Sequence, residues 1–288
     1  MRWRRSVKRG AVRVGRLFER PHRRVVLVYH SIHPSSWDFS SPPELFESHL
    51  EWLRDECEVV PLRDLIASRS GEPPAKPLVA LTFDDGYEDN HAHAMPLLAR
   101  HGLPATFFVT AGLIDGDRDV RERFGTIVRR DPGDLRFMSW SQLREMTSAG
   151  MEIGNHTYSH RNLARLAPAE VDEEVGRARS LLSEHLGTDV DLFAYPFGRP
   201  RVHFTPSVER IVEQHGHAIG LAAMYRQVRA SDPLLRIPRF FVDGDDVERL
   251  RDKVLGAYDV VGWWQEHTPL WMVRLVSPEL GRRSPAGA

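Results

Sequence analysis

Short apolar runs recur along the chain, and the segments between them repeat apolar side chains at helical spacing. Residues 25–29 form such a run, rich in β-branched side chains, and predict a buried strand. Further runs of this kind predict strands at residues 58–60, 78–83, 105–109, 151–154, 192–195, 217–223 and 235–242. Most of these runs are too continuous for a strand with one face in water, so the pattern favours a sheet that is buried on both sides.

The intervening segments predict helices at residues 43–55, 62–68, 92–101, 141–149, 168–186, 207–215 and 246–258. The longest begins at Pro168 and ends before Gly187, as helices often do. Strands that alternate with helices predict a parallel sheet with helical crossovers. The number of strands favours an α/β barrel over a short open sheet, and reactive side chains of such barrels lie at the carboxyl ends of strands.

Three segments depart from this alternation. Residues 115–136 are polar and broken by Gly and Pro, so we expect a surface excursion. Residues 1–24 carry ten Arg or Lys and one acid, with apolar residues at helical spacing, which predicts a basic amphipathic helix. That helix either lies on an anionic membrane surface or packs on its own domain, and a solvated tail is a third reading. We therefore divide the chain into residues 1–24, a barrel at 25–258 and a C-terminal segment at 259–288.

The C-terminal segment is rich in tryptophan, with Trp263, Trp264 and Trp271 close to other apolar residues. It predicts a sugar-stacking or membrane-interface patch, or a helix that closes the floor of the barrel. Residues 281–288 are polar, and we expect them to be disordered.

Composition narrows the class of protein only a little. A formal net charge of −1 over 288 residues gives no overall field that would favour nucleic acid. Cys57 is the single cysteine, so no disulfide can form within the chain. No run reaches the roughly eighteen apolar residues that span a bilayer, and no apolar core of a secretory signal is seen. We expect a cytoplasmic location, with membrane association through residues 1–20 as an alternative.

Two adjacent carboxylates, Asp84 and Asp85, end the strand at residues 78–83 and precede Gly86. Successive strand side chains point to opposite sides, and glycine permits a sharp turn, so the two carboxylates can take different roles. One metal ligand and one general base is the functional interpretation. An ordinary strand end followed by an Asp-Gly turn is the alternative.

His156 and His160 follow the strand at residues 151–154 and are four positions apart. If the chain turns helically there, both imidazoles lie on one side and can share a metal ion. With Asp85 they would form a two-histidine, one-carboxylate site with open positions, which suits zinc and also iron, cobalt or nickel. Asp84 beside it could then act as the base. Taken alone, the two histidines would be read as solvated or core residues, and their position after a strand is what favours a metal site.

The motifs around these residues resemble those of the polysaccharide deacetylases, the NodB-homology group or carbohydrate esterase family four. The resemblance rests on residues 82–86 and 156–160, on residues 193–198 as a third motif, and on residues 29–30 and 235–239. The last two are similar to the poly-N-acetylglucosamine deacetylase branch. The resemblance covers about residues 25–245, and its three ordered motifs are specific.

The resemblance implies a distorted (β/α) barrel and metal-dependent removal of N-acetyl groups from N-acetylhexosamine units. It implies that Asp84 is the general base and that Asp85, His156 and His160 hold the metal. It also implies that the backbone N–H of Phe197 helps to stabilise the oxyanion. Tyr195 and Trp140 are candidates for lining the sugar site, with core packing as the alternative for each.

The chain departs from the general family at two positions. Ala194 stands where the general family has an arginine that orients the basic aspartate, and Arg239 is our candidate replacement, with a surface ion pair as the alternative. No Leu-x-His follows Gly198, so the usual C-terminal acid is missing. In the branch resembled here a first-strand histidine takes that role, which makes His30 the candidate acid. The alternative for His30 is a buried histidine bonded to backbone.

Three functions therefore compete. The first is an N-deacetylase acting on N-acetylglucosamine-type polysaccharide or on a lipid-linked or nucleotide-linked glycan precursor. The second is an O-acetyl esterase or small-amide amidase that uses the same metal centre. The third is a catalytically silent protein that binds glycan or membrane. We expect an N-acetylated glycan as partner and no nucleic acid.

Overall fold

The computed structural model describes residues 23–35 and 37–267, without the side chains of residues 260, 264 and 265. Its strands are β1 (Arg24–Tyr29), β2 (Ser31–Ile32), β3 (Ser40–Ser41), β4 (Glu58–Val59), β5 (Leu78–Phe83), β6 (Thr106–Val109), β7 (Glu152–Asn155), β8 (Leu192–Ala194), β9 (Ile219–Ala223) and β10 (Ile237–Phe241). Its α-helices are α2 (Pro43–Glu56), α3 (Leu62–Ala67), α4 (Met95–His101), α5 (Ala111–Ile114), α6 (Arg118–Val128), α7 (Trp140–Ser148), α8 (Pro168–Leu186), α9 (Pro206–Gln214), α10 (Val247–Val254) and α11 (Asp259–His267).

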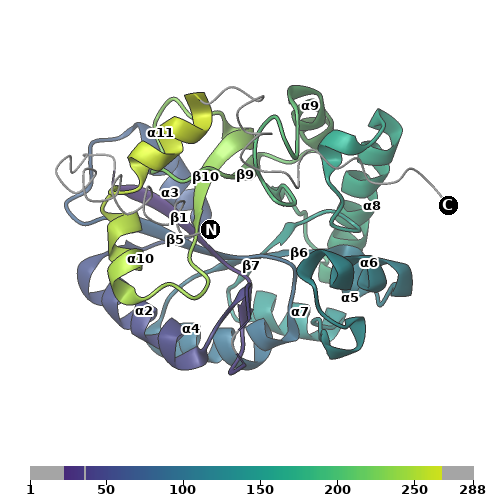
Figure 1. Cartoon of the computed structure of the whole chain (residues 1–288), viewed down its shortest axis with the longest axis horizontal. Helices are drawn as coiled ribbons and strands as arrows, with labels where there is room; N and C mark the ends of the chain where they lie inside the picture. The colour runs from purple at the N-terminus through teal and green to yellow at the C-terminus, as the bar shows by residue number, and fades with distance from the viewer. Residues whose placement is uncertain (1–22, 36, 268–288) are drawn as a thin grey trace.

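Seven parallel strands of the described chain close into a barrel, as the alternating pattern predicted. The sheet runs β1-β10-β9-β8-β7-β6-β5, and β1 pairs with β5 to close the ring. β4 pairs with the first residues of β5, and β6 pairs with the last residues of β5 along the same edge. The strands lie at the centre and the helices around them (Figure 1). The predicted distorted (β/α) barrel is therefore confirmed.

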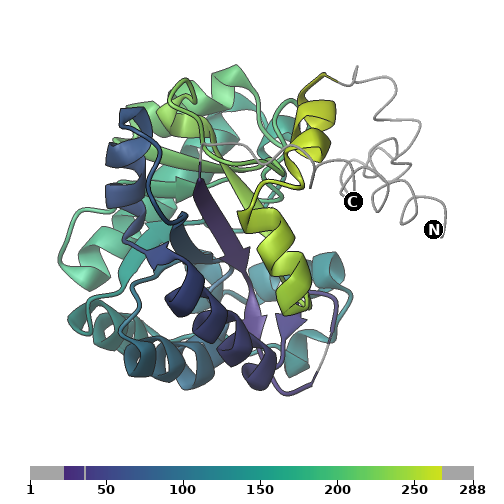
Figure 2. The ribbon, with the colours of Figure 1, turned by 90° about the vertical axis from the view of Figure 1, so that its left-hand side faces the viewer.

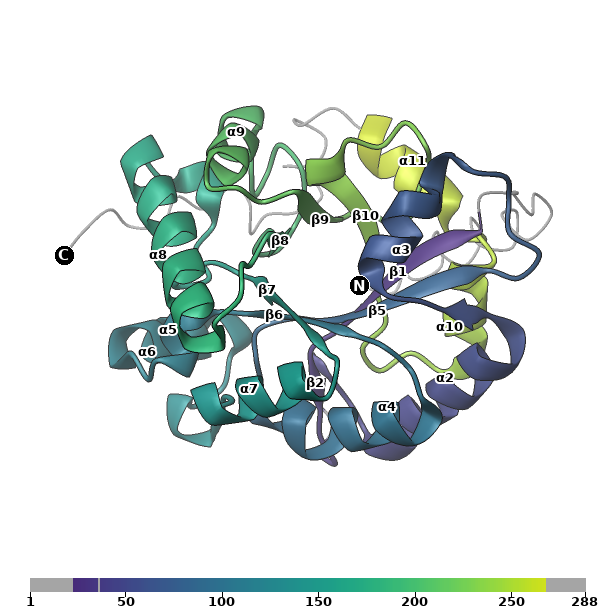
Figure 3. The same ribbon diagram turned by 180° about the vertical axis from the view of Figure 1, so that it is seen from behind.

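Helices from distant parts of the chain cover neighbouring strands. α2 and α10 lie next to each other, because β1 and β10 are neighbours in the barrel (Figures 1 and 2). α3 lies close to β5, and its buried side chains share an apolar cluster with Val26 of β1 (Figure 3). The outward faces of the strands and the apolar helix faces form the largest buried cluster, which includes Leu27, Leu81 and Phe240. The packed layer of apolar side chains between strands and helices therefore holds the strand ends at the rim in place.

The barrel interior is filled by a second, smaller apolar layer that includes Val26, Ala80, Phe108 and Ala194. Arg239 of β10 is also fully buried, with its guanidinium carbon 5.6 Å from the ring centre of Phe108. A charged side chain in such a layer costs several kcal/mol unless it is paired. Its partner identifies the site described below.

The expected surface excursion at residues 115–136 is wrong in part, because α6 occupies Arg118–Val128. Asp117 caps the helix by accepting a hydrogen bond from the Val120 N–H at 3.1 Å. Val120, Phe124 and Val128 are buried at intervals of four residues. That spacing was readable in the sequence, but the many charged residues between these positions obscured it.

α11 contains the first part of the tryptophan-rich segment and docks on the barrel. The Gln227 N–H donates to Asp259 at 3.0 Å, and Arg226 pairs with Glu266 at 2.6 Å. Gln227 also accepts from the Arg23 N–H at 3.1 Å, beside the start of β1. α11 thus lies near the amino end of the barrel, in line with the floor-closing interpretation. Trp263 is 54% exposed, whereas Trp271 and residues 1–22 lie outside the described residues.

No helix in the described ranges is long and apolar enough to cross a membrane.

Candidate metal centre and acid–base groups

The register of β1 and β5 brings two predicted site residues together at the carboxyl rim. Tyr29 pairs with Phe83, so His30 and Asp84 leave their strands side by side. The Asp84 N–H donates to the Tyr29 carbonyl oxygen at 2.9 Å. The chain then turns sharply, with positive φ at both Asp85 (75°) and Gly86 (84°). The sharp turn predicted from Asp-Asp-Gly is confirmed, and both carboxylates lie close to His156 Nε2, at 3.8 Å from Asp84 and 3.6 Å from Asp85.

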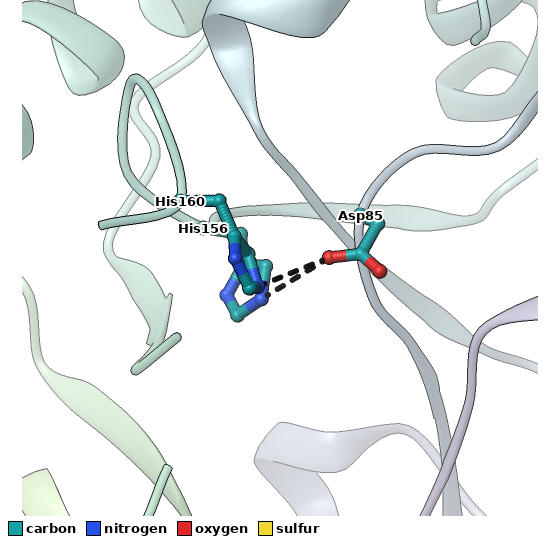
Figure 4. Close-up of side chains that lie close together, drawn as sticks. All are labelled: Asp85, His156 and His160. Atoms are coloured by element: carbon teal, nitrogen blue, oxygen red, sulfur yellow. Dashed lines mark ion pairs between the residues drawn. The ribbon is translucent and has the colours of Figure 1, made fainter. Parts of the chain in front are cut away.

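Asp85, His156 and His160 form one buried cluster with metal-ligand geometry. Asp85 Oδ1 lies 3.4 Å from His160 Nε2 and 3.6 Å from His156 Nε2. Both imidazoles face the same carboxylate oxygen (Figure 4), and the three ligand atoms lie within 4.8 Å of one another. Among the described residues Asp85 Oδ1 has no hydrogen-bond partner although it is buried. An orphaned carboxylate oxygen facing two imidazole nitrogens fits a divalent cation such as zinc.

A strained loop rather than a helical turn presents the two histidines, which corrects the sequence expectation. Residues 156–160 contain no helix, and both Thr157 (φ 68°) and His160 (φ 53°) are left-handed. The Asn155 side chain accepts from the Thr157 N–H at 2.7 Å, and the Thr157 hydroxyl oxygen accepts from the His160 N–H at 3.1 Å. Non-glycine residues in this region are held against strain by their surroundings, as often occurs at functional sites.

Hydrogen bonding fixes the tautomer of His156. Its Nδ1 lies 2.7 Å from the Ala194 carbonyl oxygen, which can only accept, so Nδ1 carries the proton and Nε2 keeps a free lone pair. Burial lowers the pKa of His156 to about 4 and that of His160 well below its usual value. Both imidazoles are therefore neutral near pH 7, which is the form that binds metal ions.

Arg239 binds Asp84 with both of its terminal nitrogens, each 2.7 Å from one carboxylate oxygen. Both side chains are buried, so the alternative of a surface ion pair is excluded. Arg239 reaches Asp84 through the barrel interior. It lies on β10, which is separated from Ala194 of β8 by the single strand β9. Arg239 therefore contacts the predicted base, as the sequence proposal requires, and its role in orienting that base stays a prediction.

The two adjacent carboxylates have opposite pKa shifts, as a division of roles requires. Burial opposes ionisation of Asp84, but Arg239 outweighs it and, with His156, lowers the pKa of Asp84 to about 2. Burial raises the pKa of Asp85 to about 7; the negative charge of Asp84 adds to this and His30 opposes it. A cation at the cluster would keep Asp85 ionised, whereas Asp84 is ionised at neutral pH without one.

His30 is paired with Asp243, a residue that the sequence reasoning missed. Asp243 accepts from the His30 backbone N–H at 2.9 Å, and its other oxygen lies 2.6 Å from Nδ1. Burial opposes the charged imidazole, but Asp243 outweighs it and raises the pKa of His30 to about 9. The side chain therefore carries a proton at neutral pH, and its Nδ1 is bonded to a carboxylate rather than to backbone. Asp243 follows β10 directly, and this position at a strand end was the available signal.

Phe197 lies against the metal-ligand cluster. Its φ is 60°, and its ring lies 4.8 Å from the ring of His160. Within residues 23–35 and 37–267 its backbone N–H donates to no protein acceptor. An unpaired N–H next to a metal ligand is compatible with the predicted oxyanion role.

The two predicted sugar-lining aromatics have other contacts in the structure. Tyr195 is 1% exposed and stacks on Phe204 with ring centres 3.7 Å apart, so core packing describes this position. Trp140 stacks on His185 of α8 at 4.0 Å and packs against the core. Their substrate-binding role is thus without support from the geometry.

α6, which the sequence reasoning missed, contributes to the same cluster. The ring of Phe124 meets the ring of His160 edge to face at 5.3 Å. Tyr158, between the two histidines, donates from its hydroxyl to Asp117 at 2.8 Å. α6 therefore supports the metal-ligand loop from outside the barrel.

Comparison with known proteins gives consistent matches. The profile of the family described as "Polysaccharide deacetylase" matches residues 71–220, just over half of the chain. YxkH of Bacillus subtilis (strain 168) is 26% identical over 205 residues, which cover 70% of this chain and 65%, less than two thirds, of YxkH. The poly-beta-1,6-N-acetyl-D-glucosamine N-deacetylase of Staphylococcus aureus (strain MRSA252) is 22% identical over 223 residues, which cover 74% of this chain and 71% of that protein.

Solved structures agree with the fold. IcaB from Ammonifex degensii matches with a TM-score of 0.67 and 27% identity, covering 81% of this chain and 97% of that one. The Streptococcus pyogenes deacetylase PplD, solved in complex with acetate, matches with a TM-score of 0.67 and 24% identity, covering 80% and 97%. The resemblance recognised in the motifs is confirmed. With the profile match over residues 71–220, these relatives show that the chain belongs to the polysaccharide deacetylase family, a family of hydrolases.

Proposed function

We propose that this protein is a metal-dependent hydrolase that removes N-acetyl groups from N-acetylglucosamine-type polysaccharide or from a glycan precursor. The single observation that carries the proposal is the cluster of Asp85, His156 and His160 beside an ionised Asp84 that Arg239 holds. A buried base next to two neutral imidazoles and an orphaned carboxylate oxygen has no evident structural purpose.

Asp85, His156 and His160 would hold the divalent metal. Bound there, the metal would supply Lewis acidity to the acetyl carbonyl and lower the pKa of a nearby water. Zinc suits two imidazoles and a carboxylate, and iron, cobalt and nickel suit them as well. We propose zinc as the bound metal, with iron, cobalt and nickel as the alternatives.

The acid–base work falls to Asp84 and His30. Asp84 is oriented by Arg239 and ionised at neutral pH, so it can take a proton from the attacking water. The water oxygen bonds to the acetyl carbon, and the bond from that carbon to nitrogen breaks. His30 carries a proton at neutral pH and can give it to the departing nitrogen, so that acetate and a free amine result. In this proposal the Phe197 N–H stabilises negative charge on the carbonyl oxygen, which the contact of its ring with His160 supports.

Acetate release tests the proposal. The full chain is stripped of metal, reloaded with zinc, cobalt or nickel, and supplied with N-acetylglucosamine oligomers. We expect turnover only in loaded protein, and a fall of about 10²-fold to 10⁴-fold in Asp84→Asn. If the folded, metal-loaded protein releases no acetate from any acetylated sugar, the deacetylase proposal is contradicted. The remaining alternative is then a catalytically silent protein that binds glycan or membrane.

The same assay separates the hydrolase alternatives. Cleavage of O-acetyl xylan or a nitrophenyl ester without cleavage of the amide would favour the esterase. The proposed substrate class is supported by the activity that gives the Staphylococcus aureus relative its name and by the motifs at residues 29–30 and 235–239. Membrane contact through residues 1–20 and a cytoplasmic location are further proposals that rest on the sequence alone.

A further inference from the structure

The turn at residues 242–245, which follows β10, carries Asp243, the partner of His30, and is called the Asp243 turn below. The Asp245 N–H donates to the Val242 carbonyl oxygen at 3.1 Å, and Gly244 is left-handed with a φ of 63°. The turn leaves further backbone and side-chain groups of these residues to be bonded by other elements. Two helices outside the barrel supply partners for them.

His49 of α2 ties the Asp243 turn to the end of β1. Its Nε2 lies 2.9 Å from the Asp245 carbonyl oxygen, and its Nδ1 lies 3.1 Å from the Tyr29 hydroxyl. Because a carbonyl oxygen can only accept, Nε2 carries the proton, and Nδ1 accepts from the Tyr29 hydroxyl. Tyr29 directly precedes His30, and Asp245 lies two residues beyond its partner Asp243. One imidazole is therefore bonded to the chain beside each member of the acid pair.

Packing alone does not account for a histidine at position 49. The other buried side chains of α2 are apolar and belong to Phe46, Leu50 and Leu53. His49 is 0% exposed, and burial lowers its pKa to about 4, so the ring is neutral at pH 7. A neutral imidazole offers one donor and one acceptor, and both are used here. A buried polar ring is unfavourable without such bonds, so the two bonds are the feature that distinguishes this side chain from its apolar neighbours.

Lys253 of α10 holds the same turn from the neighbouring helix. Its buried ammonium group donates to the Phe241 carbonyl oxygen and to the Asp245 carboxylate. Phe241 and Asp245 lie two residues on either side of Asp243, so this one cation spans the turn. α2 and α10 lie next to each other (Figure 1), and together they fix the position of the Asp243 turn against β1.

We propose that His49 is a positioning residue for the pair of His30 and Asp243, because its two hydrogen bonds hold the chain beside each member. The proposal rests on the proposed function, since it takes His30 as the acid, and it assigns no contact with substrate to His49. Loss of the bonds would release the Asp243 turn from β1 and loosen the carboxylate on Nδ1 of His30. A misplacement of about 1 Å in an active site can lower the rate by about 10²-fold.

The test replaces His49 in the metal-loaded full chain. His49→Phe keeps a ring of similar size and removes both hydrogen bonds, whereas His49→Gln can still accept from Tyr29 and donate to Asp245. We expect His49→Phe to lower kcat for N-acetylglucosamine oligomers by about 10-fold to 10²-fold with little change in KM, and His49→Gln to recover most of the loss. His101→Phe is the matched control, because this histidine of α4 is also largely buried and its Nε2 lies 3.9 Å from Glu47, away from the turn. Its kcat should stay unchanged.

A measurement without turnover separates this role from the proposed function. NMR titration of His30 in the metal-free protein should give a pKa of about 9 in the unaltered chain. We expect this pKa to fall by about one unit in folded His49→Phe, because Asp243 is less firmly held, and to stay in place in His49→Gln and His101→Phe. If His49→Phe does not fold, Tyr29→Phe removes a single hydroxyl oxygen and should lower the pKa in the same direction.

Three results would overturn the positioning role. They are an unchanged pKa of His30 in folded His49→Phe or its substitute Tyr29→Phe, an equal fall in His101→Phe, and a His49→Gln variant as impaired as His49→Phe. If the unaltered protein releases no acetate but the pKa of His30 falls as expected, the proposed function is contradicted and the role of His49 in holding the pair stands.

Discussion

Arg239 is the residue on which the state of the base depends. Without Arg239, burial would raise the pKa of Asp84 instead of leaving it at about 2. Because this pKa lies below the ordinary 3.8, ionised Asp84 stabilises the fold above about pH 4, and that stabilisation is lost as the pH falls toward 2. A guanidinium inside the barrel thus keeps Asp84 ionised, as its proposed role as base requires, and ties the stability of the fold to acid pH.

Arg239→Met should therefore lower activity and shift the acid limb of the pH–rate profile to higher pH. It should also destabilise the protein by about 3–5 kcal/mol, because it leaves a buried carboxylate unpaired. Arg236→Met is the matched control: its pair with Glu209 is partly exposed, and we expect a loss of about 0–1 kcal/mol. Denaturant unfolding and pH–rate measurements check both, and equal effects in the two variants would contradict the interior role of Arg239.

Asp243 controls the proton on His30. The pKa of His30 is raised from 6.5 to about 9, so its charged form stabilises the fold below pH 6.5, and this stabilisation is lost as the pH rises through 9. In Asp243→Asn burial acts without the opposing carboxylate, so the pKa of His30 should fall. We expect the alkaline limb of kcat/KM to move toward neutral pH by about one unit or more. NMR titration of His30 measures the fall in its pKa. An alkaline limb of kcat/KM that stays in place in Asp243→Asn would contradict His30 as the acid.

At the scale of elements, α8 holds the metal-ligand loop through a buried carboxylate. Glu174 accepts from the Ser159 N–H at 2.8 Å and from the Ser159 hydroxyl, and its carbonyl oxygen accepts from the Tyr158 N–H at 2.9 Å. These bonds hold the segment between His156 and His160 against the strain of its left-handed residues. Glu174 is therefore a positioning residue for the cluster.

Glu174→Ala should weaken metal binding by roughly 10- to 100-fold, as changes to the partners of metal ligands typically do. Glu174→Gln keeps an acceptor for the Ser159 N–H and should recover part of the affinity. Glu173→Ala is the matched control. Glu173 is exposed on the same helix, and its carboxylate forms only a long ion pair, with its oxygen 3.9 Å from Arg177. Titration with Co²⁺, followed by its absorption, measures affinity without turnover; unchanged affinity in Glu174→Ala would contradict the positioning role.

The sequence predicted the barrel and most of its strands because buried parallel strands leave continuous apolar runs. It also predicted that Asp84, Asp85, His156 and His160 come together at strand ends, which the structure shows, since their motifs follow such runs; their roles stay predictions. It missed α6 because charged residues obscured the spacing of Val120, Phe124 and Val128, and it missed Asp243 because the pairing of this strand-end carboxylate with His30 depends on how distant strands align. It assigned Tyr195 to the sugar site, where a buried stack on Phe204 could not be told from an exposed one.

At the scale of the whole molecule, the two ends of the barrel differ in chemistry. The metal cluster lies at the carboxyl rim, whereas a cavity of about 460 Å³ lies near the amino ends of β1 and β5. Arg23, Lys76 and Arg251 line this cavity together with Trp52 and one carboxylate, Glu56, and in the sequence Arg23 directly follows the basic segment at residues 1–22. A basic surface at this end would add to the attraction of the N-terminal segment for anionic lipid.

We therefore expect the full chain to co-sediment with phosphatidylserine vesicles more than with phosphatidylcholine vesicles, and less as salt rises. Changing Arg23, Lys76 and Arg251 together to Gln should weaken this binding. Arg118→Gln is the control, because Arg118 is exposed at the start of α6 and lies outside this cavity. Equal sedimentation with both lipids would remove the membrane proposal and leave the catalytic one intact.

The profile match at residues 71–220 contains the predicted base and metal ligands. His30, which follows β1, lies outside it, and so do Arg239 and Asp243, which lie on and just after β10. Asp84 and its arginine are 155 residues apart. A nascent chain on the ribosome would thus carry the predicted base and the three predicted metal ligands well before Arg239 could bind Asp84. Until β10 docks against β1, the enzyme would be inert, and a chain cut before residue 237 should remain so.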